Sequence, residues 1–225
     1  MNDLSEKETV EAIRTWWQEN GKFIIAGIVL GAGGLFGWNQ WQARVQGQAE
    51  AASMVFERLI DAVGRGSEYD AKAAADTLAQ DYASTPYAEQ ARLALAKLYV
   101  EQGKSDEAAA ELRALADAAE PPLSLIARHR LARVLLYQDK PEEALQVLGV
   151  GDPGAFRPRF LELRGDAEFA LGRPEAAREA WTAALAAPGE PPLIDMRLVR
   201  MKLDELGAPE PMADVAAPAA EGDTP

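Results

Sequence analysis

Gly103-Lys-Ser-Asp-Glu-Ala108 is a stretch that returns twice along the chain, as Asp139-Lys-Pro-Glu-Glu-Ala144 and as Gly172-Arg-Pro-Glu-Ala-Ala177. The final alanines of the three stretches are 36 and 33 residues apart. Each stretch is typical of a turn followed by a helix start. Pro141 and Pro174 suit the first helical turn, where a missing N–H costs nothing, and the acidic residues suit the positive end of the helix dipole. The period therefore predicts a repeat of helix pairs.

Residue size also recurs at fixed offsets from these turns. Small residues allow two helices to approach closely, and large apolar residues fill the space between helix pairs. This pattern resembles the tetratricopeptide repeat, which implies a stacked α-solenoid. The small positions upstream are Ala96, Ala132 and Gly165, and the large positions downstream are Leu112, Leu148 and Trp181.

An earlier and more degenerate unit is expected with Ala62, Ala74, Leu78 and Pro86 at the equivalent offsets. The chain departs from the repeat pattern where Arg65 and Glu168 replace a usual tyrosine and Asp139 replaces a glycine. No segment alternates like a strand, so the expected fold class is all-α. We expect helices over residues 5–20, 22–45, 47–64, 70–83, 87–101, 105–118, 123–137, 141–148, 158–171, 174–186 and 192–206.

A run of 21 uncharged residues extends from Phe23 to Ala43, between Lys22 and Arg44. As a helix it would be about 31 Å long, which matches the hydrocarbon core of a bilayer. We interpret residues 22–43 as a single transmembrane helix. Indole rings favour the headgroup level of a membrane, and tryptophans flank the run at both ends: Trp16, Trp17, Trp38 and Trp41.

Two other interpretations of the run are weaker. A buried helix of a soluble protein would seldom contain so many glycines, because glycine disfavours helices. A cleaved signal peptide would begin with a short basic stretch, whereas residues 1–22 carry five acidic and three basic residues. The small residues Ala49-Glu50-Ala51 also lie too far downstream for its cleavage site. We therefore expect a permanent anchor.

The anchor contains glycines at a spacing that lets membrane helices approach one another closely. Basic residues flank the anchor almost equally, with three before it and two soon after it. The positive-inside rule therefore favours a cytoplasmic N-terminus only slightly. The candidate membrane-helix contacts are Gly27, Gly31, Gly33 and Gly37.

Charge and composition argue against several function classes. The formal net charge is −13, of which residues 1–22 carry −2 and residues 207–225 carry −4, so −7 remains on the repeat region. Such a surface should repel nucleic acid. The chain has no cysteine, and His129 is the only histidine, so these side chains cannot complete a metal site or a catalytic triad. We expect a non-enzymatic protein without a cofactor or a metal.

The expected binding surface is the concave face of the repeat array, which the first helix of each pair lines. An apolar stripe beside Lys97 and Arg133 could hold an extended or helical peptide. The alternative is that Val100, Leu136 and Phe169, which share one repeat position, only pack against neighbouring helices. The candidate groove residues are Gln90, Leu93, Lys97, Val100, Ile126, His129, Arg133, Leu136, Arg159, Glu162, Asp166 and Phe169.

Four segments, taken in order, resemble the family of ancillary SecYEG translocon subunits of Gram-negative bacteria. They are the amphipathic N-terminus Glu6-Lys-Glu-Thr-Val-Glu-Ala-Ile-Arg-Thr-Trp-Trp-Gln-Glu-Asn-Gly21, the end of the anchor Gly37-Trp-Asn-Gln-Trp41, the segment Tyr87-Ala-Glu-Gln-Ala-Arg-Leu-Ala-Leu-Ala-Lys-Leu-Tyr99 and the closing helix Met201-Lys-Leu-Asp-Glu-Leu206. The order of these parts is more specific than any one of them, because repeat modules alone occur in many unrelated proteins.

The resemblance implies a single-pass inner-membrane protein that associates with the SecYEG translocon and with a membrane-anchored periplasmic chaperone of the peptidyl-prolyl isomerase-like type. It also implies a role in passing unfolded secreted proteins to periplasmic chaperones. A membrane-tethered scaffold for envelope assembly, cell division or stress-response regulation stays open as an alternative. The expected parts are a cytoplasmic amphipathic segment (1–21), the transmembrane anchor (22–43), a periplasmic repeat domain (44–206) and a disordered acidic tail rich in proline and alanine (207–225).

Overall fold

The computed structural model describes residues 3–187 and 193–207, and within these ranges every regular element is a helix. This confirms the all-α solenoid. The expected acidic tail lies outside the described residues except for Gly207. The helices are α1 (Asp3–Gly64), α2 (Glu68–Asp81), α3 (Pro86–Glu101), α4 (Ser105–Ala118), α5 (Leu123–Tyr137), α6 (Pro141–Leu148), the 3₁₀ helix η1 (Gly154–Phe156), α7 (Arg157–Ala170), α8 (Pro174–Ala186) and α9 (Met196–Glu205).

The first helix is longer than the sequence pattern predicts. Three helices over residues 5–20, 22–45 and 47–64 were expected, but α1 is one helix of 62 residues. The expectation was wrong because glycine lowers helix propensity by only about 1 kcal/mol and does not interrupt the hydrogen-bond ladder as proline does. No proline occurs between Asp3 and Gly64.

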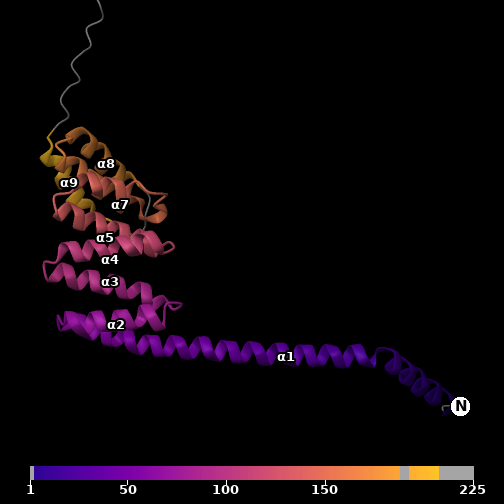
Figure 1. Cartoon of the computed structure of the whole chain (residues 1–225). Coiled ribbons are helices and arrows are strands. Elements are labelled where there is room, and N and C mark those ends of the chain that lie inside the picture. The colour runs from indigo at the N-terminus through magenta and orange to yellow at the C-terminus, as the bar shows by residue number, and fades with distance from the viewer. Residues whose placement is uncertain (1–2, 188–192, 208–225) are drawn as a thin grey trace, which may run out of the picture.

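The remaining helices form a column at one end of α1 (Figure 1). Consecutive helices pack against each other from α1 to α9. The first helices of successive pairs also touch, α1 against α3 and α5 against α7. The C-terminal part of α1 is thus the first helix of the first repeat unit, and the rest of α1 projects away from the column (Figure 1).

Four turns inside the helix pairs share one hydrogen-bond pattern. In each turn an N–H reaches a carbonyl five residues back, as from Lys104 to Tyr99 at 2.8 Å, and the preceding N–H reaches a carbonyl three residues back. This is the Schellman arrangement, which needs a left-handed residue after the helix end. The left-handed residues are Gly66, Gly103, Asp139 and Gly172, with φ of 69°, 74°, 59° and 70°.

These turns correct the expected register of the first unit. Ala71 is equivalent to Ala108 in the repeat. The Ala71 N–H donates to the Ser67 carbonyl and the Ala108 N–H donates to the Lys104 carbonyl, and Ser67 and Lys104 are the last residues of the two turns. Ala71 is also fully buried, whereas Ala74 is only half-buried. The placement that begins at Ala62 is therefore wrong by three residues. Apolar side chains at i and i+3 lie on the same helix face, so the sequence alone could not separate the two registers.

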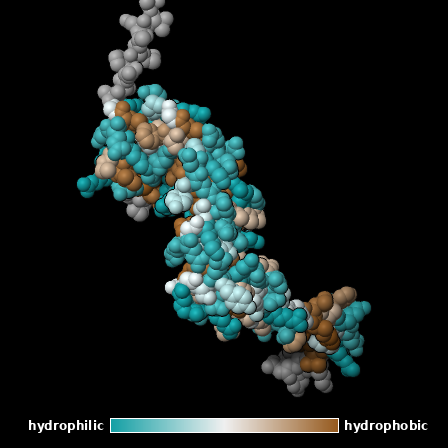
Figure 2. Space-filling model, turned by 60° about the vertical axis from the view of Figure 1, so that its left-hand side comes forward, coloured by the Kyte–Doolittle hydropathy of each residue, from teal (hydrophilic) through white to brown (hydrophobic). Residues whose placement is uncertain are grey.

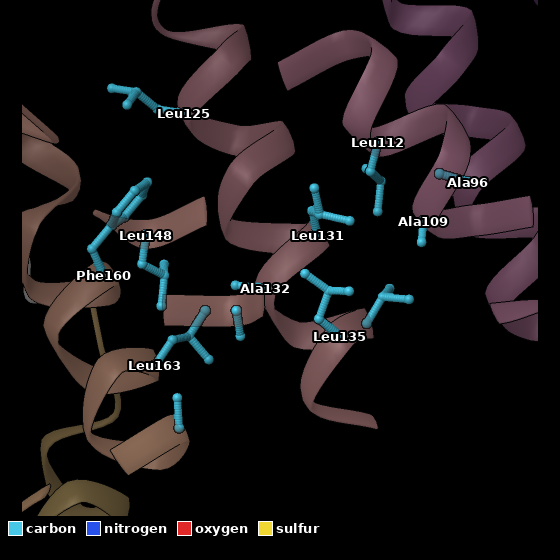
Figure 3. Packing of buried hydrophobic residues seen from close by; sticks show 13 residues of the cluster. Ala96, Ala109, Leu112, Leu125, Leu131, Ala132, Leu135, Leu148, Phe160 and Leu163 are labelled. Carbon is cyan, nitrogen blue, oxygen red and sulfur yellow. The ribbon is translucent and has the colours of Figure 1, made fainter. Parts of the chain in front are cut away.

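The core of the column is built from small and large residues that alternate between helices. Side chains from α3 to α7 form one continuous cluster, in which Leu112, Leu131 and Leu135 pack near the small residues Ala96 and Ala132 (Figure 3). The predicted pairing of small and large positions is confirmed here, because Ala96, Leu112 and Ala132 are at most 2% exposed.

The last unit uses a different small and large pair. The indole ring of Trp181 lies directly against Gly165, and a Cβ added at Gly165 would overlap that ring. The Trp181 Nε1–H donates to the Glu162 carbonyl at 3.1 Å and to Asp166 Oδ1 at 3.0 Å. A larger residue on one helix is therefore accommodated by a smaller residue on its neighbour.

Helix α9 closes the C-terminal end of the column. Its first turn is capped by Asp195, whose carboxylate accepts from the N–H groups of Arg197 and Leu198. Val199 is fully buried in a cluster with Ala177 and Trp181. The helix therefore covers an apolar surface on the last repeat unit that would otherwise be exposed.

Candidate peptide-binding groove

An open groove lies between α3 and α5, with α4 behind it. Its volume is about 630 Å³. The groove is on the face lined by the first helices of the pairs, which is where the sequence placed a binding surface. The lining residues are Ala96, Lys97, Val100, Glu101, Gly103, Ser105, Leu112, Arg130, Arg133, Val134 and Tyr137.

The floor of the groove is apolar and the rim is charged. Ala96, Leu112 and Val134 are buried and form the floor. Val100 and Tyr137 stand higher, at 52% and 80% exposed, and give an apolar wall on each side. An apolar floor between exposed apolar side chains can accommodate side chains of another protein.

Three cations and one acid line the rim. Lys97 on α3 makes an ion pair with Glu101 at 3.6 Å. Arg130 and Arg133 on α5 make no ion pair or side-chain hydrogen bond with any described residue. The groove is thus positively charged in a chain whose net charge is −13.

His129 lies beside the groove and is neutral near pH 7. Its pKa is lowered to about 4, mainly by burial and then by the charges of Arg133, Arg159 and Arg130, in that order. The imidazole ring also contacts Phe160, with centroids 6.5 Å apart. His129 therefore acts as a packing residue between α5 and α7.

The third unit of the predicted groove is occupied by the C-terminal helix. Lys202 of α9 donates to Asp166 at 2.7 Å and to Glu162 at 3.3 Å. Its ammonium group also lies 5.8 Å from the centre of the Trp181 ring. Arg159 donates to the Leu193 carbonyl at 2.8 Å. These three predicted residues thus contact the chain's own C-terminal segment.

The other predicted residues divide between core and surface. Leu93 and Leu136 are half-buried and pack against the core, as the alternative interpretation of the apolar stripe anticipated for Leu136. Phe169 is 51% exposed and contacts Trp181 at 5.8 Å between ring centroids. Gln90 is exposed and Ile126 is half-buried, and neither lines the open groove.

Sequence reasoning missed Arg130 and Tyr137. The predicted face of α5 contained residues 126, 129, 133 and 136, whereas residues 130, 133, 134 and 137 line the groove. The true face is rotated by about one residue, which is about 100° on a helix. The repeat offset could have identified Tyr137. The residues of α5 at the same repeat positions as Lys97 and Glu101 are Arg133 and Tyr137.

Elsewhere in the described residues, the side chains with shifted pKa values join neighbouring units. The Lys104 ammonium donates to the Glu68 carboxylate, which raises the pKa of Lys104. Burial, helped by the charge of Glu68, raises the pKa of the nearby Tyr99. Among the described residues no group of three His, Cys, Asp or Glu side chains is placed to hold a metal ion.

The predicted anchor is exposed along nearly its whole length, with Ile24 half-buried. One helix of the described residues, within Thr9–Gly64, is long and apolar enough to cross a membrane, and 6% of its most apolar window is buried. Brown, apolar atoms gather on this projecting helix, while most of the column is teal (Figure 2). A Cβ added at Gly27, Gly31, Gly33 or Gly37 would meet no side chain and no other helix within 4 Å. Within the described residues this helix is therefore not part of the buried core.

Comparison with known proteins agrees with this architecture. A family model described as a tetratricopeptide repeat-like domain matches residues 14–208. The protein named ancillary SecYEG translocon subunit of Escherichia coli is 32% identical over 203 residues, which cover 90% of this chain and 97% of the relative. The chain belongs to this tetratricopeptide repeat-like family of ancillary SecYEG translocon subunits. The relative of the same name from Haemophilus influenzae is 31% identical over 90% of this chain and 98% of its own length.

Proposed function

We propose that this ancillary subunit is anchored in the inner membrane by residues 22–43 and acts as a non-enzymatic partner of the SecYEG translocon. The name shared by its relatives supports the partner, and the exposed apolar part of α1 supports the anchor. The observation that carries the proposal is the continuity of α1, which is both the projecting apolar helix and the first helix of the repeat array.

If residues 22–43 cross the membrane, the continuity of α1 supports a position of the repeat array close to the membrane. Ala52, the first buried residue of the array, follows Ala43 by nine residues, which is about 14 Å of helix. The other repeat helices run roughly alongside α1 (Figure 1). If α1 crosses the membrane, the column extends along the membrane surface and its groove stays near the translocon.

In this proposal the short N-terminal segment is cytoplasmic and the repeat domain is periplasmic. Three basic residues precede the anchor and two follow it within the next turns of α1, which supports this orientation slightly. The acidic repeat surface suits a soluble domain that must not adhere to anionic lipid headgroups.

The groove between α3 and α5 is proposed to bind unfolded secreted proteins as they emerge, or a membrane-anchored periplasmic chaperone of the peptidyl-prolyl isomerase-like type. The subunit would then pass secreted chains to periplasmic chaperones. An open groove with an apolar floor supports reversible peptide binding, which a handover requires.

Site-specific photo-crosslinking in native membranes tests this function. A photoreactive residue at Val100 samples the groove, and one at Gly31 samples the anchor. A third at Ala110, an exposed position on α4 outside the groove, is the matched control. We expect secreted chains or a periplasmic chaperone from Val100, translocon subunits from Gly31, and neither from Ala110. Adducts with cytoplasmic proteins from Val100 would contradict the orientation and the function.

A further inference from the structure

The interval between α3 and α5 differs from the other intervals between first helices. The first helices α1 and α3 pack against each other, as do α5 and α7. Lys202 bridges α9 to α7 through Glu162 and Asp166. Between α3 and α5 the space is open and about 630 Å³ in volume. This interval therefore has room for a segment of another protein.

The balance of charges in this interval differs from that of a second hollow, between α1 and α2. The second hollow is lined by two cations, Arg58 and Arg65, and two acids, with Arg65 paired to Asp61 at 3.1 Å and to Asp70 at 3.7 Å. The groove between α3 and α5 has three cations and one acid. In the groove between α3 and α5, Arg130 and Arg133 have no such partner among the described residues. Their guanidinium groups are free to bind an external acceptor.

We infer that the groove selects peptide segments in which carboxylate side chains stand next to apolar side chains. This inference rests on the proposed function and names the class of ligand. An apolar side chain of the peptide would lie on the floor between Val100 and Tyr137. Flanking carboxylates would pair with Arg130 and Arg133, because guanidinium groups bind carboxylates through two parallel hydrogen bonds.

The same arrangement disfavours basic segments. A lysine in the peptide would face Arg130, Arg133 and Lys97, with only Glu101 to compensate, and Glu101 is already paired with Lys97. Like charges placed together across an interface reduce affinity. Acidic and apolar segments are thus favoured both by attraction at the rim and by rejection of basic alternatives.

Binding of short fluorescent peptides to the full chain in nanodiscs tests the inference. The first probe alternates leucine and glutamate, the second carries glutamine in place of glutamate, and the third carries lysine. We expect the glutamate peptide to bind about tenfold more tightly than the glutamine peptide, as charge-assisted hydrogen bonds would give. We expect the lysine peptide to bind more weakly than either.

Variants separate the groove from the general charge of the chain. Arg130→Gln with Arg133→Gln should remove the preference for glutamate over glutamine. Arg164→Gln, an exposed arginine on α7 outside the groove, is the matched control and should keep it. Val100→Ser with Tyr137→Ser should weaken all three peptides. Circular dichroism checks that each variant retains its helical content.

Three results would overturn the inference in different ways. If leucine peptides bind in the groove with equal affinity whatever their charge, the selection for carboxylates is wrong and the proposed peptide-binding function stands. If no peptide binds, or if Val100→Ser with Tyr137→Ser changes nothing, the groove is not a peptide site and both proposals fail in this respect. If Arg164→Gln also removed the preference for glutamate over glutamine, that preference would come from the overall electrostatic field of the protein and not from the groove.

Discussion

The two parts of α1 have the same secondary structure and opposite surroundings. From Phe23 to Val45 nearly every large apolar side chain is exposed, whereas Ala52, Leu59 and Ala62 are at most 1% exposed. Glycines show the same contrast. A Cβ added at Gly27 or Gly31 would meet no side chain and no other helix within 4 Å. A Cβ added at Gly165 in the repeats would overlap the Trp181 ring.

This difference shows where the partners of each part must be found. In the repeat array the chain supplies its own contacts, so packing explains the identity of each residue. In the projecting part of α1 ten large apolar side chains between Phe23 and Val45 are exposed, and such exposure is costly in water. In the proposed anchor, a bilayer or another membrane protein supplies the contacts of these side chains.

The largest expected effect comes from charging the projecting part. Val29→Arg with Leu30→Arg should cost about 6 kcal/mol of insertion free energy, because each arginine near the centre of a span costs about 3 kcal/mol. We expect the chain to leave the membrane fraction after alkaline extraction. The matched control is Met54→Arg with Ile60→Arg, at exposed positions in the packed part of the same helix, and it should remain membrane-bound.

The next largest effect concerns the repeat array. Gly165→Ala should lower the free energy of unfolding by about 3 kcal/mol, because the new methyl group overlaps the buried Trp181 ring. Gly31→Ala in the anchor should leave the unfolding of the repeat domain unchanged. Urea denaturation measures both. In the Gly165→Ala background, Trp181→Leu recreates the alanine and leucine pair of the other units and should recover part of the loss. No recovery would contradict the proposed packing complementarity.

The pH dependence of stability tests the buried side of α5. His129 has a folded pKa of about 4, below the usual 6.5 of the unfolded chain. Between these values the unfolded state binds more protons, so stability should fall as the pH drops from 7 to 4, by about 2 kcal/mol from this residue. His129→Gln should reduce that slope. An identical slope in both proteins, measured by thermal unfolding, would show that His129 is well solvated.

The smallest effect concerns the turn at Asp139. Its φ of 59° is unfavourable for a residue with a side chain. Asp139→Gly should therefore raise the free energy of unfolding by about 1 kcal/mol, and Gly103→Ala in the equivalent turn should lower it by a similar amount. Equilibrium denaturation of the two variants compares them directly. A destabilised Asp139→Gly would show that the Asp139 carboxylate contributes to the turn.

Local features of the fold were predictable from the sequence. Glycine and proline mark the turns, and Asp139 was recognised at a glycine position that proved to be left-handed. The register of the first unit was not predictable, because Ala71 and Ala74 lie one turn apart on the same face. The length of α1 was mispredicted for a related reason, since glycines weaken a helix without ending it.

The groove was predictable only in part. Lys97, Val100 and Arg133 were placed in it from the repeat offsets, and they line it. Arg130 and Tyr137 were missed, because the face of a helix that opens to solvent depends on how far the neighbouring helix stands away. The contact of Lys202 with Glu162 and Asp166 joins residues that are 40 and 36 positions apart. No local pattern in the sequence indicates such a pair.

Cysteine labelling along α1 tests most directly the claim that one helix has a membrane part and a repeat part. The chain has no cysteine of its own, so single variants label without background. Leu30→Cys, Phe36→Cys, Met54→Cys and Ile60→Cys all lie at positions that are exposed in the isolated chain. In intact membranes a water-soluble maleimide should label residues 54 and 60 and leave residues 30 and 36 unlabelled until detergent is added. Equal labelling of all four positions before detergent would contradict the claim.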